Sequence, residues 1–330
     1  MVFGPCGGVR PTGACELDAE LPCPWTDPVD PVDVRPWPGP AGARPPAAAG
    51  SLLDAAAARP VVLTDLNVPA YDLTGLREIA GLLAGVSDAL LVGEHHDCPD
   101  FPPAITATEV LDAGTRPWIT LTCRDRNRVV LEQEIAGLAA LGVEGVLCVT
   151  GDGRGPDVRP EVTQVFDLDS TRLAHLAAEA GLTATVAVAP AAPPADARVR
   201  GLLEKQRAGA SLAVVNHVSS AAALRAFLVD ARSAGVDLPV LAGVAVYSDE
   251  RSARALQALP GLALDDDAVE RVVASDDVVE AGIEAAVAEA GALLAVPGVA
   301  GVNLSGTGSS VGYRAGAEVK AEIARRLREV

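Results

Sequence analysis

The segments Thr183-Ala-Thr-Val-Ala-Val-Ala189 and Pro239-Val-Leu-Ala-Gly-Val-Ala-Val246 are almost continuously apolar and rich in β-branched residues. Runs of this kind, without a polar alternation, are typical of strands that are buried on both faces of a parallel sheet. The chain contains eight short β-branched runs in all, which begin near Val61, Ala89, Trp118, Gly145, Thr183, Leu212, Pro239 and Gly301. Successive starts lie 27–38 residues apart, except for a last gap of 62 residues.

Segments with helical periodicity lie between these runs, for example Val129–Leu141 and Ala221–Ala234. The wide last gap predicts extra helices around Asp265–Glu289. Eight strand–helix units within residues 60–330 predict an α/β protein with a (β/α)8 TIM barrel, a fold that typically takes about 250 residues. A doubly wound sheet is the alternative, but the even spacing of the units favours a closed barrel.

Two segments precede the predicted barrel. Residues 1–25 contain Cys6, Cys15 and Cys23, and in a cytoplasmic chain such crowding favours metal or cluster ligands over disulfides. A closed zinc site needs four ligands, so three ordinary thiols are the alternative. Residues 26–59 are rich in proline and then in alanine, and proline disfavours helix, so we expect a linker or arm there.

Composition and charge exclude several classes of function. The net charge is −18 and the pI is near 4.6, which disfavours binding to nucleic acid or to an anionic membrane surface. No segment approaches the roughly 18 uninterrupted apolar residues of a membrane span, and the first residues lack the features of a signal peptide. We therefore expect a cytoplasmic enzyme.

Polar residues at the C-terminal ends of the predicted strands are the candidate site residues, because active sites of such barrels lie there. They are Asp65, Glu94, Asp152, Asn216 and Tyr247. Asp152 is the strongest single candidate, because Gly-Asp directly after a central strand places a carboxylate in the barrel mouth. For Asp65, a helix cap is an equally good interpretation.

Three loops have a less specific pattern. Arg124, Asp125 and Arg126 predict a solvated loop. His95 and His96 resemble half of a metal site, but no third ligand follows at a metal-site spacing, so we interpret the pair as loop polarity. The glycine-rich segment 306–312 precedes a helix predicted to start near Arg314, which suits either a bound phosphate or a flexible loop.

Several motifs together resemble the methylenetetrahydrofolate reductase family, in order and in spacing, over residues 60 to about 310. They are Leu121-Thr-Cys-Arg-Asp-Arg-Asn-Arg128, Gly145-Val-Leu-Cys-Val-Thr-Gly-Asp152, Val165-Phe-Asp-Leu-Asp-Ser170, Lys205-Gln-Arg-Ala-Gly-Ala210, Leu241-Ala-Gly243 and Gly301-Val-Asn-Leu304. The segment around Gly4-Pro-Cys-Gly-Gly8 is similar to a cysteine module that accompanies such reductases in some bacteria. That likeness implies zinc or an iron–sulfur cluster at Cys6, Cys15 and Cys23.

The resemblance implies that the enzyme reduces 5,10-methylenetetrahydrofolate to 5-methyltetrahydrofolate, either through FAD reduced by NAD(P)H or by direct hydride transfer. It implies that Asp65 supplies a proton where the family has Glu, and that Asp152 stabilises positive charge near the pterin. Asn216 replaces a family Gln that binds folate, and Glu94 and Tyr247 are further substrate candidates. The residues implied for the cofactor are Thr122, Thr150, Gly151, Asp169 and Lys205.

The chain departs from the family pattern at its flavin contacts. Ala189-Pro-Ala-Ala-Pro-Pro194 lacks the usual aromatic residue and histidine, and Thr120 replaces a common histidine. These losses predict a weakened flavin site. The alternatives are a non-redox folate-dependent C1 or methyl-transfer enzyme, and a partner subunit that carries zinc or an iron–sulfur cluster. Besides folate, we consider a homo-oligomer or an electron-transfer partner.

Overall fold

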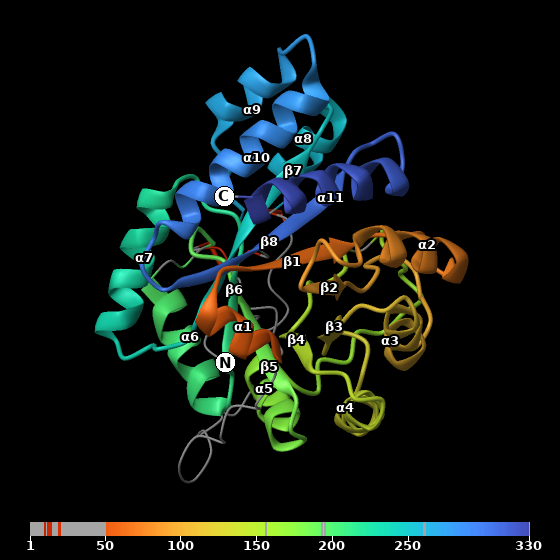
Figure 1. The fold of residues 1–330 in the computed structure, drawn as a ribbon. Coiled ribbons are helices and arrows are strands. Elements are labelled where there is room, and N and C mark those ends of the chain that lie inside the picture. The colour runs from red at the N-terminus through yellow and green to blue at the C-terminus, as the bar shows by residue number, and fades with distance from the viewer. Residues whose placement is uncertain are drawn as a thin grey trace.

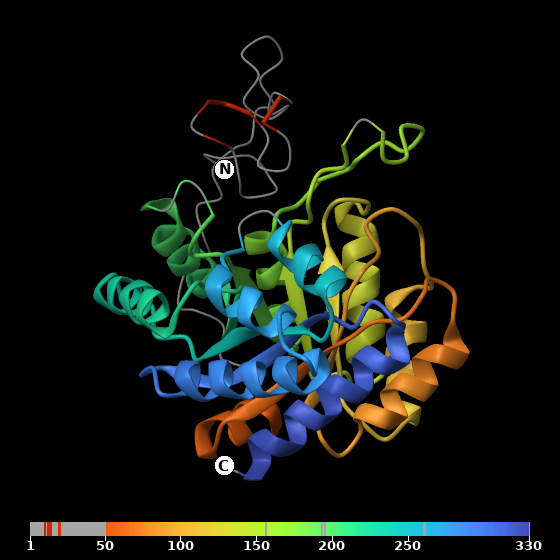
Figure 2. The same cartoon turned by 90° about the horizontal axis from the view of Figure 1, so that it is seen from above.

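Eight parallel strands close into a barrel in chain order, with β8 hydrogen-bonded back to β1 (Figure 1, and Figure 2 from above). The structure is a computed structural model that describes residues 10, 12–14, 19–20, 51–155, 157–192, 194, 196–259 and 262–329. The strands are β1 (Val61–Leu66), β2 (Ala89–Val92), β3 (Pro117–Thr122), β4 (Gly145–Val149), β5 (Thr183–Val188), β6 (Leu212–Val215), β7 (Val240–Tyr247) and β8 (Val299–Gly308). The predicted (β/α)8 barrel is confirmed, and every strand begins within two residues of its predicted start.

Helices surround the barrel; α2 to α10 connect successive strands, α1 precedes β1 and α11 follows β8. They are α1 (Ser51–Ala58), α2 (Leu73–Leu83), α3 (Pro103–Asp112), α4 (Arg128–Ala140), α5 (Ser170–Glu179), α6 (Asp196–Ala208), α7 (Ala221–Ser233), α8 (Glu250–Gln257), α9 (Asp266–Val273), α10 (Val278–Leu294) and α11 (Tyr313–Glu329). Many begin at an Asp, Asn or Ser whose side chain accepts a backbone N–H of the first turn, as Asp72 does for α2. The wide gap before β8 holds α8, α9 and α10. In the part of the chain that the structure describes, every helix is too short or too polar to cross a membrane.

The strands bury side chains on both faces, which explains their continuous apolar sequence. On β1, Val62 packs outward among the helices, whereas Val61 and Leu63 belong to a separate cluster inside the barrel. Side chains alternate along a strand, so Asp65 continues the inward-facing row. The interior is therefore apolar near the strand starts and becomes polar toward the C-terminal mouth.

Helix α1 corrects the expectation of an arm that extends to residue 59. Leu52 is fully buried in the interior cluster beside residues at the strand starts, and its N–H donates to Glu144 Oε1 at 2.6 Å. Between Pro46 and Pro60 the chain has no proline and is rich in alanine, so a helix can form there. Residues 51–58 thus cover the N-terminal end of the barrel, while the other domain boundaries remain predictions.

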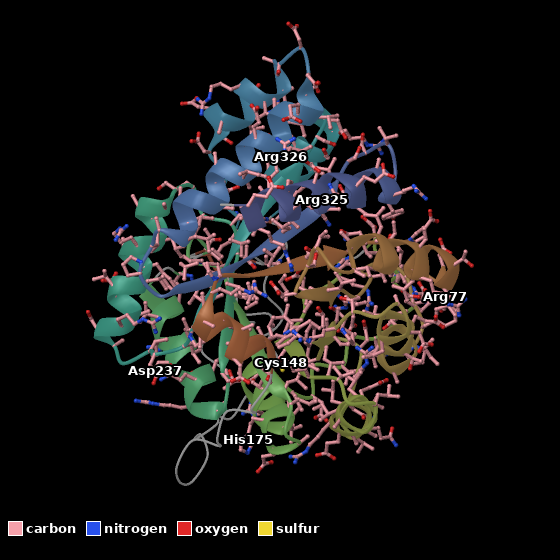
Figure 3. The ribbon with its side chains drawn as sticks, viewed as in Figure 1. Arg77, Cys148, His175, Asp237, Arg325 and Arg326 are labelled. Carbon is pink, nitrogen blue, oxygen red and sulfur yellow. The ribbon has the colours of Figure 1, made fainter. Side chains whose placement is uncertain are left out.

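Ion pairs link neighbouring helices on the outer surface. Figure 3 labels Arg77 on α2, which pairs with Glu109 of α3, and Arg326 on α11, which pairs with Glu280 of α10 at 2.6 Å. Exposed pairs of this kind contribute little to stability, typically about 0–1 kcal/mol. The stability of the fold therefore depends mainly on the packing of buried side chains.

Trp118 on β3 is completely buried inside the barrel, near the strand starts. Its Nε1–H donates to Thr185 Oγ1 at 2.9 Å. The ring lies over Gly145 of β4, where an added Cβ would sit 2.2 Å from Trp118 Cζ2. Gly145 is therefore required because the indole occupies the space of a side chain.

We predict that Gly145→Ala lowers the free energy of unfolding by about 1–3 kcal/mol, because overpacking forces the indole to move. Gly137→Ala on α4 is the matched control, since an added Cβ meets nothing within 4 Å there, and it should be neutral or stabilising by up to about 1 kcal/mol. Urea denaturation of both variants measures the difference. Equal midpoints for Gly145→Ala and the wild type would contradict the packing argument.

Candidate active site at the barrel mouth

Asp65 lies at the inward-facing C-terminal end of β1, where Asn303 and Lys320 both hydrogen-bond to it. Its Oδ1 accepts a hydrogen bond from Asn303 Nδ2 of β8 at 3.0 Å. Lys320 Nζ of α11 donates to the Asp65 carbonyl at 2.8 Å and to Asn67 Oδ1 at 2.6 Å. The alternative interpretation of Asp65 as a helix cap is wrong, because Asp72 caps α2.

Lys320 is the residue of this group that sequence reasoning missed. It is only 2% exposed, and burial lowers its pKa to about 8, although the nearby Asp65 carboxylate opposes that shift. The one signal in the sequence is rarity, since the chain contains only two lysines, Lys205 and Lys320. A desolvated ammonium group beneath the end of β1 fixes the backbone that carries Asp65.

His217, which follows β6, adds a further buried polar group near Asp65. Burial lowers its pKa, while the Asp65 carboxylate and a hydrogen bond to the backbone of Gly243 raise it. His217 Nδ1 and Asn303 Oδ1 are both buried and have no hydrogen-bond partner among the described residues. The inner mouth therefore keeps hydrogen-bonding capacity that protein groups do not use.

The predicted solvated loop after β3 is wrong, because Arg124 is only 4% exposed. Arg124 Nε donates to Asp125 Oδ2 at 2.9 Å, and Arg154 donates to both Asp125 oxygens at 2.5 and 2.7 Å. Burial would raise the pKa of Asp125, but the hydrogen bonds from Arg154 and Arg124 hold it below its usual value. We call Arg124, Asp125 and Arg154 the arginine clasp.

The arginine clasp joins three loops of the mouth. Arg124 Nη2 donates to the His95 carbonyl at 3.2 Å, and Arg154 Nε donates to the His96 carbonyl at 2.9 Å. Arg124 Nη1 also reaches the carbonyl of Asp152 at 3.5 Å. The loops after β2, β3 and β4 are thus held together, and the exposed side chain of Asp152 stands at their edge.

Gly151 lets the chain turn before Asp152. Its φ is +90°, a backbone conformation that residues with a side chain rarely adopt. An added Cβ would also lie 3.1 Å from Arg124 Cβ and 3.2 Å from Thr122 Cβ. The turn therefore accounts for Gly151 locally, and its predicted contact with a cofactor stays a prediction.

Glu94 and Thr122 lie close together and hydrogen-bond to each other. Glu94 accepts hydrogen bonds from the backbone N–H and the Oγ1 of Thr122, both at 2.9 Å, and from Arg126 Nη1 at 2.8 Å. These bonds tie β2 to β3 at the mouth. A substrate contact by Glu94 remains a prediction and would have to share this carboxylate.

The residues implied for a flavin are engaged in holding helices. Asp169 caps α5 and accepts from Arg172 Nη1 at 2.6 Å, and Thr150 Oγ1 accepts from the Ser170 N–H at 3.0 Å. Lys205 Nζ donates to the Ala187 carbonyl at 2.8 Å, and burial lowers its pKa to about 8. As placed, these groups do not fit a preformed site for a flavin diphosphate.

Tyr247 and Asn216 are placed differently from each other. The Tyr247 ring is 6% exposed and packs in a small cluster with residues of α8 and α9, where burial and the nearby Glu289 raise its pKa to about 12. Asn216 is half-buried just beyond β6, and its backbone N–H donates to the Val188 carbonyl at 2.8 Å. By strand alternation Asn216 continues the inward-facing row, so it is the better placed of the two for a ligand in the mouth.

The glycine-rich segment before α11 already binds a carboxylate of the protein. Asp249 Oδ2 accepts from the Ser310 N–H at 2.7 Å and from Ser309 Oγ at 3.1 Å. Burial opposes ionisation, but the hydrogen bonds lower the pKa of Asp249 to about 2. The structure thus favours an internal carboxylate over the expected phosphate or flexible loop.

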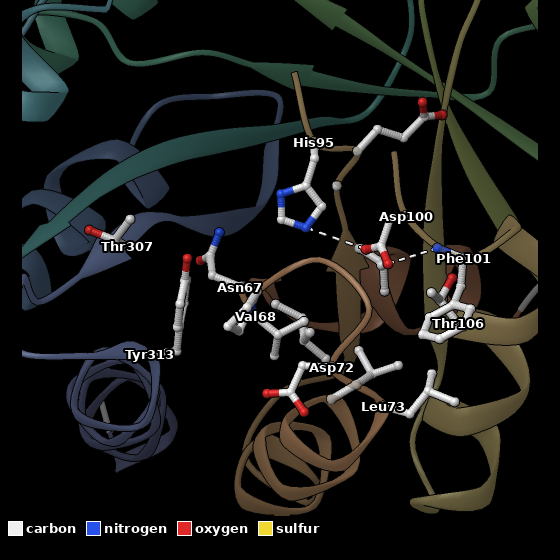
Figure 4. A pocket seen from close by; sticks show the side chains of 16 residues that line it. Asn67, Val68, Asp72, Leu73, His95, Asp100, Phe101, Thr106, Thr307 and Tyr313 are labelled. Atoms are coloured by element: carbon white, nitrogen blue, oxygen red, sulfur yellow. Dashed lines mark hydrogen bonds and ion pairs between the residues drawn. The ribbon is translucent and has the colours of Figure 1, made fainter. Parts of the chain in front are cut away.

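A pocket of about 220 Å³ lies on the β1–β2 side of the mouth (Figure 4). Its lining is mixed: apolar side chains such as Val68, Leu73 and Phe101 lie beside polar ones such as Asn67 and His95. Cys6, Cys15 and Cys23 lie outside the described residues, so the metal or cluster expected there stays a prediction.

Lys320 makes the stability of the fold depend on pH. Its folded pKa of about 8 lies below the ordinary 10.5, so between these values the unfolded chain binds more protons and stability rises with pH. We predict that the wild type gains stability relative to Lys320→Met as pH rises from about 8 to about 10. Arg325→Met, on the exposed side of the same helix, is the control and should show no such trend in urea denaturation. A pH-independent difference for Lys320→Met would refute the buried charge.

Comparison with known proteins gives one family match and several structural likenesses. A family model described as methylenetetrahydrofolate reductase matches residues 103–305, more than half of the chain. No curated protein matches the chain. An uncharacterized protein from Clostridium thermocellum, which binds two copies of 5-methyl-5,6,7,8-tetrahydrofolic acid, superposes with a TM-score of 0.59 at 12% identity, over 81% of this chain and 96% of that one. Tryptophan synthase from Mycobacterium tuberculosis gives a TM-score of 0.49 at 15% identity, over 86% of this chain and 99% of the other. The likeness to the Clostridium thermocellum protein concerns the fold alone. The family match confirms the resemblance of the motifs, and the chain belongs to the methylenetetrahydrofolate reductase family.

Proposed function

We propose that this protein is a cytoplasmic enzyme that reduces 5,10-methylenetetrahydrofolate to 5-methyltetrahydrofolate with hydride taken directly from NAD(P)H. The observation that carries the proposal is the placement of Asp65, which projects from the inner end of β1 and is held by Asn303 and Lys320. Family membership supports the reaction class. A structural neighbour that binds 5-methyltetrahydrofolic acid is consistent with a folate ligand.

The chemistry requires a proton and a hydride. Protonation of N10 opens the imidazolidine ring and leaves an iminium cation between N5 and the methylene carbon. Hydride from NAD(P)H then adds to that carbon and gives the 5-methyl product and NAD(P)⁺. In our proposal Asp65 supplies or relays the proton to N10, and the Asn303 amide orients its carboxyl group.

Asp152 has the second role in the proposed mechanism. Its carboxylate stands at the exposed edge of the mouth, on a turn that Gly151 and Arg124 hold in place. A fixed negative charge beside the pterin stabilises the iminium cation as it forms. Asn216 would hydrogen-bond the pterin from the end of β6.

Direct hydride transfer is proposed because Asp169, Thr150 and Lys205 are committed to structural bonds. The chain also has Ala189 and Thr120 where the family usually presents aromatic or histidine contacts. The proposed enzyme therefore needs NAD(P)H as a second substrate that binds in the mouth, and no step in the mechanism uses flavin.

We predict that deuterium from NADH or NADPH deuterated at both C4 positions is retained in the 5-methyl group of the product. A reduced flavin would exchange its N5 hydrogen with water and dilute the label. Mass spectrometry of the product from anaerobic turnover measures retention, and the absorption spectrum of the purified protein reports any flavin. Washout of the label together with a flavin spectrum would refute direct transfer but leave the reduction intact.

We also predict that Asp65→Asn and Asp152→Asn each lower kcat by about 10²–10³-fold while the fold is retained. Asp112→Asn, at the exposed end of α3, is the matched control and should leave kcat unchanged. The assay is anaerobic NAD(P)H oxidation driven by 5,10-methylenetetrahydrofolate. Unchanged kcat in both site variants would remove these carboxylates from the mechanism.

Non-redox C1 or methyl transfer on a bound folate is the second candidate. It is favoured by the same engaged flavin residues, combined with the open carboxylate of Asp152. This function predicts tight binding of 5,10-methylenetetrahydrofolate and no response to either nicotinamide cofactor. Turnover with NADH or NADPH would eliminate it.

A further inference from the structure

We propose that the loop after β2 is a binding site for a divalent cation of the zinc class, with His95, Asp97 and Cys98 as ligands. One ligand atom from each of these residues lies within 4.8 Å of the other two. The site lies on a different loop from Asp65 and Asp152, and the proposal does not depend on the proposed reductase activity.

The donor set selects the kind of metal. It combines an imidazole nitrogen, a carboxylate oxygen and a thiol that becomes a thiolate on binding. Zinc binds this mixture of nitrogen, sulfur and oxygen ligands, whereas magnesium and calcium prefer oxygen ligands alone. Because Asp97 and the Cys98 thiolate each carry one negative charge, together they balance the charge of a divalent ion.

Asp100 pairs with the His95 ring. Its Oδ2 lies 3.3 Å from His95 Nε2, as Figure 4 shows, and its Oδ1 accepts the N–H groups of Tyr71 and Phe101 at 2.8 and 2.7 Å. A carboxylate paired with a histidine is the usual arrangement behind a metal-bound imidazole. Asp100 is thereby placed to orient His95.

The arginine clasp holds the backbone of the same loop. The carbonyls of His95 and His96 accept hydrogen bonds from Arg124 and Arg154, which share Asp125. The backbone before Asp97 and Cys98 is therefore fixed by charged groups that are themselves largely buried. A site whose ligands are held in advance loses less conformational entropy when the cation binds.

The cation would lie beside the pocket of Figure 4, because His95 also lines that pocket. Three protein ligands leave one tetrahedral position for water or for a bound molecule. The His96 ring does not belong to the ligand group and contacts the Gly153 carbonyl at 3.4 Å instead. His96 therefore serves as an internal control one residue away.

Cobalt(II) is the probe of choice, because a thiolate bound to it gives a charge-transfer absorption. We use the full chain with Cys6, Cys15 and Cys23 replaced by Ser, so that N-terminal thiols do not contribute. Apart from Cys98, the thiols left in this variant are Cys123 and Cys148, and both are fully buried. We expect about one cobalt per chain, with the thiolate band, in this background.

Adding Cys98→Ser should abolish the band, and His95→Gln or Asp97→Asn should each weaken cobalt affinity at least about tenfold. His96→Gln should leave the band and the affinity unchanged. Circular dichroism checks that each variant is folded. If the triple Ser variant does not fold, zinc stoichiometry of the wild type is compared with that of Cys98→Ser and His96→Gln, and only Cys98→Ser should lose one equivalent.

Two results would overturn the site. One is that neither cobalt nor zinc shows any binding that depends on Cys98. The other is that His95→Gln and His96→Gln bind cobalt with equal affinity. Both readouts measure metal binding and not turnover. Failure of the reductase assay would therefore leave this proposal standing, and failure here would leave the reductase proposal standing.

Discussion

The pairing of β1 with β8 is the constraint on which the rest of the molecule depends. It aligns Val61 with Gly301 and Leu63 with Asn303 and so closes the sheet. Gly301 makes this closure sterically feasible, because a Cβ there would sit 2.2 Å from the Val61 carbonyl oxygen. Once the strands are paired, Asn303 is carried to the side chain of Asp65, and α11 brings Lys320 beneath the same residue. Asp65 precedes Asn303 and Lys320 by more than 230 residues in the sequence, and the pairing of β1 with β8 brings the three together.

Closure also decides where polar groups are tolerated. Near the strand starts the interior is filled mostly by Trp118, Leu52 and their apolar neighbours. At the mouth, Lys320, Asn303 and His217 are nearly as buried, yet each carries a polar group. Burying them costs free energy unless they are paired. Lys320 is paired with two oxygens, whereas His217 Nδ1 and Asn303 Oδ1 have no partner among the described residues.

The sequence predicts the features that depend on local chemistry. Strands buried on both faces are continuously apolar, so all eight could be located, and with them the inward end of β1 that carries Asp65. Helix α1 was missed because the prolines before it dominated the pattern. Lys320 and the arginine clasp were missed because their partners come from other loops or strands, which only the closed barrel brings together. The ligands Asp97 and Cys98 directly follow the histidine pair, so His-His-Asp-Cys was the available signal, although it lacks the spacing of familiar metal motifs.

The arginine clasp couples two parts of the mouth that the sequence separates. The guanidinium of Arg124 donates to the carbonyl of His95 and reaches that of Asp152, at 3.2 and 3.5 Å. Because the guanidinium is planar and rigid, a shift of one carbonyl changes the geometry available to the other. A cation bound by the loop after β2 would hold the His95 carbonyl in place, and through Arg124 it would restrict the turn that presents Asp152. The proposed cation site and the proposed catalytic carboxylate are therefore linked through Arg124, although they share no residue.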